Sequence, residues 1–126
     1  MAAAEPDQAI LVAQSNGKIF GLCHCGPQRT LALPSPGEFY CVYVLPGMQR
    51  QGVGKLLMTA MSRFLIGRGI LAASVWVARD NRPARSFYDW LGGVVWAEQN
   101  GMRPNFVLAE VAYGWRNLSH MVEAQP

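Results

Sequence analysis

Charged side chains are scarce in this 126-residue sequence: aspartate, glutamate, lysine and arginine together make up 15%, against 51% hydrophobic residues. Such a balance excludes an intrinsically disordered chain. No apolar run approaches the ~20 residues that a membrane-spanning helix needs. Met1–Asp7 lacks the basic start and the long apolar centre of a signal peptide. We therefore expect a single cytoplasmic domain over residues 1–126, without a membrane partner.

Basic clusters, histidines and cysteines are also sparse. The formal net charge of +3 suits an anionic ligand, but no cluster of lysine and arginine indicates a nucleic-acid partner. Cys23, Cys25 and Cys41 are too few for a disulfide framework. Cys23-His24-Cys25 could suggest a metal site, but the only other histidine is His120, so a second ligand pair is lacking. We expect no metal, and both thiols packed on one face of a strand.

One stretch, Gln49-Arg50-Gln51-Gly52-Val53-Gly54-Lys55, joins two segments of different periodicity. Residues 39–45 before it are aromatic and β-branched, which predicts a buried strand. After it, apolar residues recur at helical spacing and give a helix one apolar face. These residues are Val53, Leu56, Leu57, Ala60, Phe64 and Leu65.

This junction has the composition of an anion-binding site. The N–H groups at a helix start lack intrahelical partners, and the helix dipole adds positive potential. Gly52 and Gly54 let an anion approach the backbone, and Arg50 and Lys55 add charge. The alternative is a plain turn whose glycines serve chain reversal only. A P-loop is excluded because Lys55 is not followed by Ser or Thr, and a dinucleotide motif because Leu57 is not small.

The run from Val42 to Gly54 resembles the strand, turn and pyrophosphate loop of the GNAT superfamily of acyl-CoA N-acyltransferases, with its Q/R-x-x-G-x-G/A signature. A second segment is similar to the family's N-x-x-A-x-x-F/L-Y-x-x-x-G pattern, through Asn81, Ala84, Phe87-Tyr88 and Leu91-Gly92. The resemblance covers the chain from Ala9 to Tyr113. It implies an N-acetyltransferase that moves an acetyl group from acetyl-CoA to a primary amine by direct attack.

The N-terminal half predicts strands before the motif and a parallel crossover after it. Asn16-Gly17 between apolar runs predicts a hairpin, and a third strand ending near Leu45 completes an antiparallel meander. The helix is expected to end near residues 67–69, and residues 70–77 to form the next strand. Strand, helix and strand in this order make a right-handed crossover with parallel strands.

The C-terminal half predicts a short helix and a closing hairpin. Asn81 is a good cap for the helix, and residues 94–96 and 105–113 are expected to pair across residues 99–101. The resemblance completes the expected fold class, α/β (α+β). It implies a GNAT-like mixed, mostly antiparallel sheet flanked by helices, with a central parallel strand pair splayed at the cofactor site.

The resemblance also implies which residues bind acetyl-CoA. Backbone N–H groups from residues 50 to 55 would hold the pyrophosphate, and the preceding strand would hydrogen-bond the pantetheine arm. Asn81 could bond the same arm in addition to capping its helix. The expected cofactor-binding set is Val42, Tyr43, Val44, Gln49, Arg50, Gln51, Gly52, Val53, Gly54, Lys55, Asn81 and Tyr88.

Glu38 and Tyr88 are the expected catalytic residues. An alkyl amine has to lose a proton before it attacks, and Glu38 lies where many relatives carry an acid. Strand alternation puts Glu38 on the same face as Tyr40 and Val42; its alternative role is an exposed carboxylate at a strand end. Tyr88 matches the family's tyrosine, whose phenol donates to the CoA sulfur, and its alternative role is that of a core tyrosine.

The acceptor side stays open at this point. Relatives usually begin with a strand and two helices that have no counterpart before Ala9, so a homo-oligomer or an open site is expected. Tyr40, Trp76 and Trp96 suit an apolar acceptor if they are not core residues. The acceptor could be a small amine, a peptide N-terminus, a lysine or an antibiotic. A second class of function, an acyl-CoA-binding regulatory module without transferase activity, accommodates the same motifs.

Overall fold

The computed structural model describes residues 7–30, 33–49 and 51–123. Its elements follow one another as β1 (Ala9–Ser15), β2 (Lys18–Pro27), β3 (Gly37–Val44), η1 (Pro46–Met48), α1 (Val53–Gly67), β4 (Ala73–Ala78), α2 (Arg82–Trp90), β5 (Val94–Arg103), β6 (Phe106–Trp115) and α3 (Ser119–Glu123). Six strands form one sheet in the order β1-β2-β3-β4-β6-β5. Only β3 and β4 run parallel, so the expected mixed and mostly antiparallel sheet is confirmed.

The first hairpin forms where the sequence predicts it. Asn16 and Gly17 have φ values of 53° and 77°, and Ser15 pairs with Lys18 across them. Positive φ at both loop positions is what a two-residue hairpin with matching twist requires, and asparagine and glycine accept it best. The crossover from β3 through α1 to β4 is also confirmed, because these two strands are parallel neighbours.

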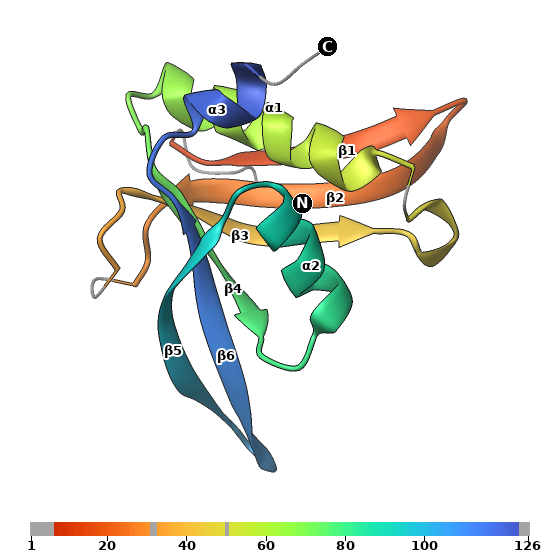
Figure 1. The fold of residues 1–126 in the computed structure, drawn as a ribbon. Coiled ribbons are helices and arrows are strands. Elements are labelled where there is room, and N and C mark those ends of the chain that lie inside the picture. The colour runs from red at the N-terminus through yellow and green to blue at the C-terminus, as the bar shows by residue number, and fades with distance from the viewer. Residues whose placement is uncertain (1–6, 31–32, 50, 124–126) are drawn as a thin grey trace.

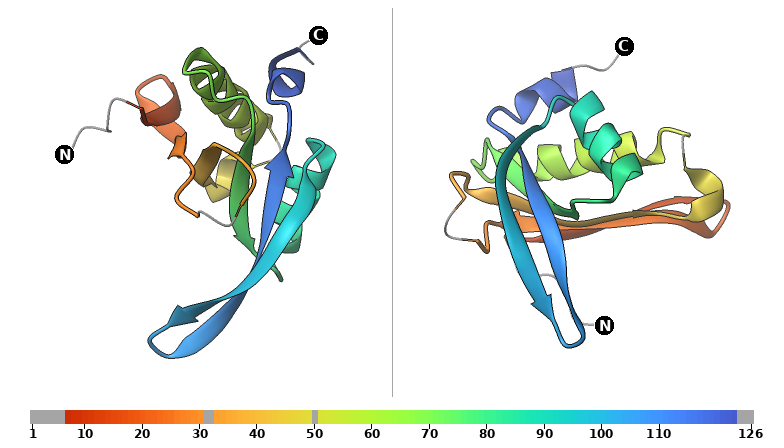
Figure 2. Two further views of the ribbon diagram at one scale, coloured as in Figure 1. Left: turned by 90° about the vertical axis from the view of Figure 1, so that its left-hand side faces the viewer. Right: turned by 60° about the horizontal axis from the view of Figure 1, so that its bottom comes forward.

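All three helices lie on one face of the sheet in the described part of the chain. Figure 1 shows α1 and α3 above β1, β2 and β3, with α2 beside the gap between β3 and β4. The views in Figure 2 show the β5–β6 hairpin reaching away from this body as a curved arm. No helix among the described residues is both long and apolar enough to cross a membrane. The opposite face of the sheet therefore has no helical cover within these residues.

The core lies between α1 and the sheet. On the helix, Leu57, Met58, Met61 and Leu65 are buried, whereas Leu56, which the periodicity placed on the apolar face, is exposed. Ser62 is also buried, and its hydroxyl is satisfied there because it donates to the carbonyl oxygen of Met58 at 2.8 Å. The predicted apolar face was therefore wrong at Leu56. Met58 and Met61, which the prediction did not include, are buried in the core.

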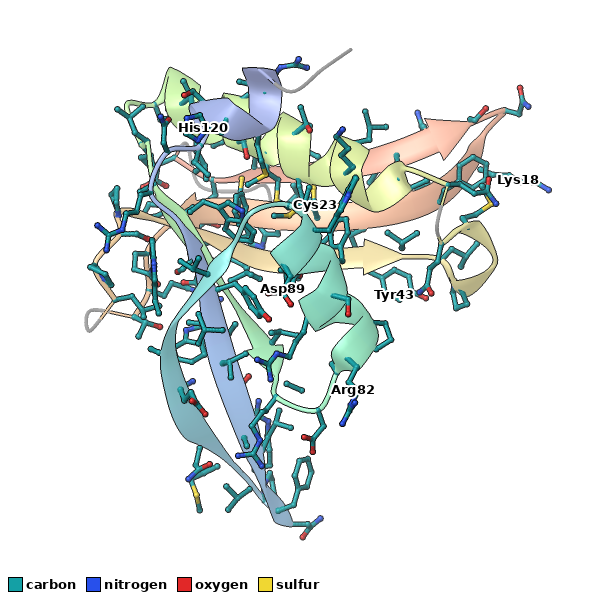
Figure 3. The ribbon with its side chains drawn as sticks, viewed as in Figure 1. Lys18, Cys23, Tyr43, Arg82, Asp89 and His120 are labelled. Carbon is teal, nitrogen blue, oxygen red and sulfur yellow. The ribbon has the colours of Figure 1, made fainter. Side chains whose placement is uncertain are left out.

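The two thiols of the Cys-His-Cys segment belong to this core, as expected. Cys23 and Cys25 are fully buried on the helical face of β2, and Figure 3 shows Cys23 beneath α1. Burial raises the pKa of Cys23 to about 12 and that of Cys25 to about 11, so both stay neutral thiols. No group of three potential metal ligands occurs in the described residues. Cys41 is exposed.

Two predicted boundaries were wrong. The fourth strand begins at Ala73 rather than at residue 70. The closing hairpin turns at Pro104-Asn105, between the paired Arg103 and Phe106, whereas residues 99–101 continue β5. Asn100-Gly101 favoured a turn by local preference, but proline cannot occupy the interior of a paired strand, and so the turn lies at Pro104.

Gly114 is the most constrained glycine of the sheet. A Cβ atom there would overlap the indole ring of Trp96 from the neighbouring strand. We expect Gly114→Ala to lower the free energy of unfolding by about 1–3 kcal/mol, because the ring has to leave its place. Gly67→Ala is the matched control: open space surrounds Gly67 at the end of α1, and alanine there should add about 0.5–1 kcal/mol. Urea denaturation of both variants measures the two shifts, and equal stability of Gly114→Ala and the parent would contradict the packing described.

Candidate active site

The sheet opens between its two parallel strands. Pairing of β3 with β4 is confined to Gly37 with Ala73 and Glu38 with Ser74, although β3 continues to Val44 and β4 to Ala78. A cleft of about 290 Å³ lies in the gap between the two strands. It is lined by Tyr40, Cys41, Val42, Val75, Trp76, Val77, Ala78, Asn81, Ala84 and Tyr88. The expected splay of the parallel pair is therefore confirmed.

A bulge in β3 accompanies this opening. Cys25 pairs with Phe39 and His24 pairs with Cys41, which leaves Tyr40 as an extra residue on β3. A bulge bends its strand and increases the local twist. The bend directs the second half of β3 away from β4, so the backbone edge of this segment is free to meet a ligand.

The bulge also changes which face of the sheet the later side chains of β3 occupy, so the prediction made from simple alternation was wrong there. Glu38 and Tyr40 share the face without helices, so their expected common face is confirmed, but Val42 lies on the other face. Its partner on β2 is Cys23, and its side chain packs against the core below α1. Simple alternation failed because one extra residue at the bulge reverses which face the following side chains occupy.

The start of α1 lies at the end of β3, beyond η1. Gly52 precedes the helix with φ 82° and no side-chain cap, and its carbonyl oxygen accepts from the N–H of Leu56 at 3.0 Å. Val53, Gly54 and Lys55 form the first turn, where backbone N–H groups lack intrahelical partners. Such a turn attracts anions. Arg50 lies outside the described residues.

Gly54 has a second reason to be glycine. A Cβ atom there would lie 3.0 Å from Cζ of Phe87 on α2, so the absence of a side chain lets the two helices approach each other. Gln51 is exposed, and Gln49 donates from Nε2 to the carbonyl oxygen of Val44 at 3.4 Å. The exposed ring of Tyr43 lies on the face opposite α1, so only its backbone borders the opening.

Asn81 caps α2, as predicted. Its Oδ1 accepts from the backbone N–H of Ala84 at 3.3 Å, and Pro83 occupies the first turn. The residue is exposed and lines the cleft at the same time. Asn81 thus borders the opening while its side-chain oxygen is used by the cap.

Tyr88 is the most buried polar side chain of this cleft. Its ring lies 5.6 Å from that of Tyr113 and 5.9 Å from that of Trp115, and only 6% of the residue is exposed. Burial raises the pKa of Tyr88 to about 12, so the phenol stays protonated near neutral pH. Within the described residues its hydroxyl has no hydrogen-bond partner. The ring of Tyr88 therefore packs in the core, and the role of its hydroxyl as a donor to the CoA sulfur stays a prediction.

A second cavity, of about 440 Å³, lies on the face without helices. Its lining is Arg29, Thr30, Glu38, Tyr40, Trp76, Gln99 and Glu110. Tyr40 and Trp76 line both cavities, so these two side chains border both spaces. We name this second space the acceptor-side cavity. Trp96 is not part of its lining and packs over Gly114 instead.

Glu38 is neither exposed nor unpaired. The residue is 3% exposed, and Arg29 donates to its carboxylate from the backbone N–H at 3.0 Å, from Nε at 3.2 Å and from Nη2 at 2.9 Å. The same guanidinium lies 3.9 Å from the ring centroid of Tyr40. The hydrogen bond with Glu38 raises the pKa of Arg29 further. The expectation of an exposed strand-end carboxylate is wrong, and the role of Glu38 as a base stays a prediction.

Arg29, Gln99 and Glu110 are polar residues of the site that sequence reasoning missed. Arg29 follows the strand end at Gly26-Pro27, where a loop returns over the sheet. Glu110 is the single charge in an otherwise apolar strand, β6, and this isolation was the signal that could have identified it. Such a carboxylate within a half-buried strand needs a partner or a function.

The two parallel strands separate, and a helix preceded by Gly52 begins at one end of the opening. The acyltransferases that both sequence motifs resemble have this arrangement. The profile of the Acetyltransferase (GNAT) family matches residues 2–92, and the chain belongs to this family.

Individual proteins agree with this assignment. The chain is 35% identical over 113 residues to the uncharacterized N-acetyltransferase YuaI of Bacillus subtilis (strain 168), covering 89% of this chain and 65% of that protein. It is 32% identical over 117 residues to mycothiol acetyltransferase of Arthrobacter sp. (strain FB24), covering 90% of this chain and 32% of the relative. Among solved structures, yncA from Salmonella typhimurium with its cofactor acetyl-CoA has a TM-score of 0.71 at 22% identity, covering 86% of this chain and 64% of that one. The chain thus spans less than two thirds of the length of these relatives.

The Arg29–Glu38 pair can be tested through stability. Arg29→Gln leaves a buried carboxylate without its cation and should lower the free energy of unfolding by about 1–3 kcal/mol, allowing for the exposed position of Arg29. Adding Glu38→Gln in the same chain removes the orphaned charge and should recover part of the loss. Chemical denaturation of the two single variants and the double variant completes the thermodynamic cycle. Strictly additive losses would mean that the two side chains do not interact.

Proposed function

We propose that this chain transfers an acetyl group from acetyl-CoA to a primary amine by direct attack. Family membership supports acetyl-CoA as co-substrate. The observation that carries the proposal is that two neighbouring cavities share Tyr40 and Trp76 in their linings. One cavity lies between parallel strands with an available backbone edge, and the other is lined by the carboxylates of Glu38 and Glu110. An acyl donor in the first and an amine in the second would meet at Tyr40 and Trp76.

The first-turn N–H groups of α1 are suited to the pyrophosphate of CoA, because they combine unpaired donors with the positive end of the helix dipole. Gln49, Gln51 and Lys55 border this turn, and Arg50 precedes it in the sequence. The backbone of β3 from Val42 to Val44 would hydrogen-bond the pantetheine arm, since β4 does not use this edge. Asn81 would add a side-chain bond. A thioester held in this cleft would supply the activated acyl carbon.

Two proton movements accompany transfer. The acceptor ammonium loses a proton before its nitrogen can attack, and the sulfur that leaves gains one. Tyr88 is suited to the second step, because its phenol stays protonated near neutral pH and the residue lines the cleft. Glu38 is the proposed acceptor of the first proton, through water rather than by direct contact, because Arg29 already engages both of its oxygens.

Transfer is tested with acetyl-CoA and a panel of primary amines, by measuring CoA thiol release and the acetylated product by mass spectrometry. Tyr88→Phe should lower kcat by about 10- to 1000-fold, because its hydrogen bond strengthens as charge develops on sulfur. The affinity for acetyl-CoA, measured by calorimetry, should change little. Tyr113→Phe is the control, since its hydroxyl accepts from Arg85 at 3.1 Å rather than facing the cleft.

Each result separates the candidate functions. Amine-dependent CoA release by the parent with full activity of Tyr88→Phe would make Tyr88 a packing residue. Binding of acetyl-CoA without transfer to any amine would favour the acyl-CoA-binding module. None of the relatives named above supports that alternative.

We also propose that the chain forms a homo-oligomer through the face without helices. The register places Val12 opposite Leu22 and Leu22 opposite Tyr43, and all three side chains are exposed on this face. The face continues into the acceptor-side cavity, because the ring of His24 lies 4.8 Å from that of Tyr40. Exposed apolar patches of this kind are typical of contact surfaces. In a dimer with a two-fold axis, each copy would cover this patch on the other.

Light scattering across a dilution series tests this association. We expect the parent to dissociate on dilution, and the double variant Val12→Ser/Leu22→Ser to be monomeric at concentrations where the parent is not. Leu56→Ser is the matched control, because Leu56 is equally apolar and exposed but lies on α1 in the opposite layer. A parent that is monomeric at every concentration, or a control that dissociates equally, would overturn the proposal.

A further inference from the structure

The acceptor-side cavity contains two carboxylates, and they differ in what they can still bind. Glu38 accepts three hydrogen bonds from Arg29, so its charge is neutralised inside the protein. A substrate cation that approached Glu38 would compete with a guanidinium held at close range on both oxygens. It would also meet the positive charge of Arg29, whose side chain is 60% exposed at this end of the cavity. This end of the cavity is therefore unsuited to an ammonium group.

Glu110, at the other end, has only weak partners. Its Oε1 accepts from Nε2 of the exposed Gln99 at 3.2 Å. Its Oε2 lies 4.0 Å from Nη2 of Arg103, which is beyond hydrogen-bond distance, and the arginine side chain is 41% exposed. Exposed pairs of this kind contribute little. A carboxylate offers about four lone-pair sites, so Glu110 keeps most of its capacity to accept hydrogen bonds, although its side chain is only 15% exposed.

The sheet register places Glu110 beside Trp76, which lines both cavities. Glu110 pairs with Ala78 and Ala112 pairs with Trp76, so Glu110 and Trp76 lie on the same face of neighbouring strands. Gly101 on β5 makes room for the carboxylate, because a Cβ atom there would lie 2.8 Å from Oε1 of Glu110. The Asn-Gly segment that does not form a turn thus creates the space in which this charge lies.

The wall between Glu110 and the cleft is aromatic. The indole nitrogen of Trp76 donates to Oγ1 of Thr30 at 3.2 Å, which fixes the plane of the ring. Trp76 and Tyr40 line both cavities. Arg29 already lies over the Tyr40 ring, whereas no cation lies over Trp76 among the described residues. A fixed indole beside a carboxylate is suited to a cation carried on an apolar body.

We infer that Glu110 is the specificity-determining residue that receives the ammonium group of the acceptor, and that the acceptor class is a primary alkylammonium whose apolar body lies against Trp76. This inference rests on the proposed function and deepens it, since it concerns which amines enter the acceptor-side cavity. Arg29 excludes a second cation from the opposite end. Neutral amines of the same shape gain less from Glu110, because their hydrogen bond to its carboxylate lacks the donor charge.

The test compares Glu110→Gln with Glu98→Gln. Both changes remove one negative charge from the β5–β6 hairpin. Glu98 pairs with Val111, one position from the pair of Gln99 with Glu110, so its exposed side chain lies on the other face of the sheet. The probes are phenethylamine, which is cationic near neutral pH, and O-benzylhydroxylamine, which has nearly the same shape but is neutral there.

Two readouts are collected for each protein: KM and kcat for each amine with acetyl-CoA, and the calorimetric Kd for phenethylamine in the presence of CoA. Glu110→Gln should raise KM and Kd for phenethylamine by about 10- to 100-fold, the weight of a charge-assisted hydrogen bond. Values for O-benzylhydroxylamine and for acetyl-CoA should change less than about threefold, and thermal melting should be unchanged. Glu98→Gln should behave as the parent throughout.

The outcomes separate this inference from the proposed function. Transfer to phenethylamine with equal KM in Glu110→Gln and the parent would overturn the inference while the function stands. Binding of phenethylamine that depends on Glu110, without any transfer, would support the inference while the function fails. An equal rise of KM for both amines, or in both variants, would also overturn it, because Glu110 would then act through shape or overall charge. Neither binding nor turnover of phenethylamine by the parent would overturn it for this acceptor class.

Discussion

The lost pairing between β3 and β4 is the constraint on which the rest of this structure depends. Two parallel strands that remained paired along their length would leave no opening in the middle of the sheet. Here the pairing ends after Glu38 and Ser74, and the bulge at Tyr40 bends β3 away. Backbone groups that a continuous sheet would satisfy internally are thereby left to a ligand. An extended, hydrogen-bonding chain such as pantetheine is suited to such an edge.

The opening is tolerated because both of its sides are held elsewhere. β3 keeps its full antiparallel pairing with β2, and β4 keeps its pairing with β6. The helices close the core above the gap, where Gly54 lets α1 approach Phe87 of α2. Tyr88 and Trp115 pack edge to face beneath them. The molecule can therefore hold two divergent strands without losing the core that each of them supports.

Local signals in the sequence predicted the parts of the fold that local chemistry decides. Asn16-Gly17 gave the first hairpin because both loop positions need positive φ. Asn81 capped its helix because its side chain reaches the N–H of Ala84. The same reasoning misplaced the last turn, since Asn100-Gly101 has the same local preference as Asn16-Gly17 but lies within a strand whose register is set by distant neighbours.

Features that depend on contacts between distant residues could not be predicted from the sequence, for a related reason. A bulge is visible only when both strands of a pair are known, so alternation placed Val42 on the wrong face. The partner of Glu38 could not be foreseen either, because Arg29 reaches it from the preceding loop rather than from a neighbouring position. Of the candidate site, the cleft residues were therefore predictable in part, and Glu38 was the predicted polar residue of the acceptor-side cavity, whereas Arg29, Gln99 and Glu110 were missed.

The residues of the two cavities differ in how well the sequence predicted them, because the two linings come from different elements of the fold. The motif residues that resemble the family lie at the start of α1 and on α2, around the cleft suited to the common donor. The acceptor-side cavity takes Arg29 from the β2–β3 loop and Gln99 and Glu110 from the curved β5–β6 arm. These elements carry no motif. Only Tyr40 and Trp76 border both spaces, because they lie on the two strands that diverge. Under the proposed function, donor binding would thus be tied to the backbone geometry of the opening, whereas acceptor choice would depend on side chains at its far rim.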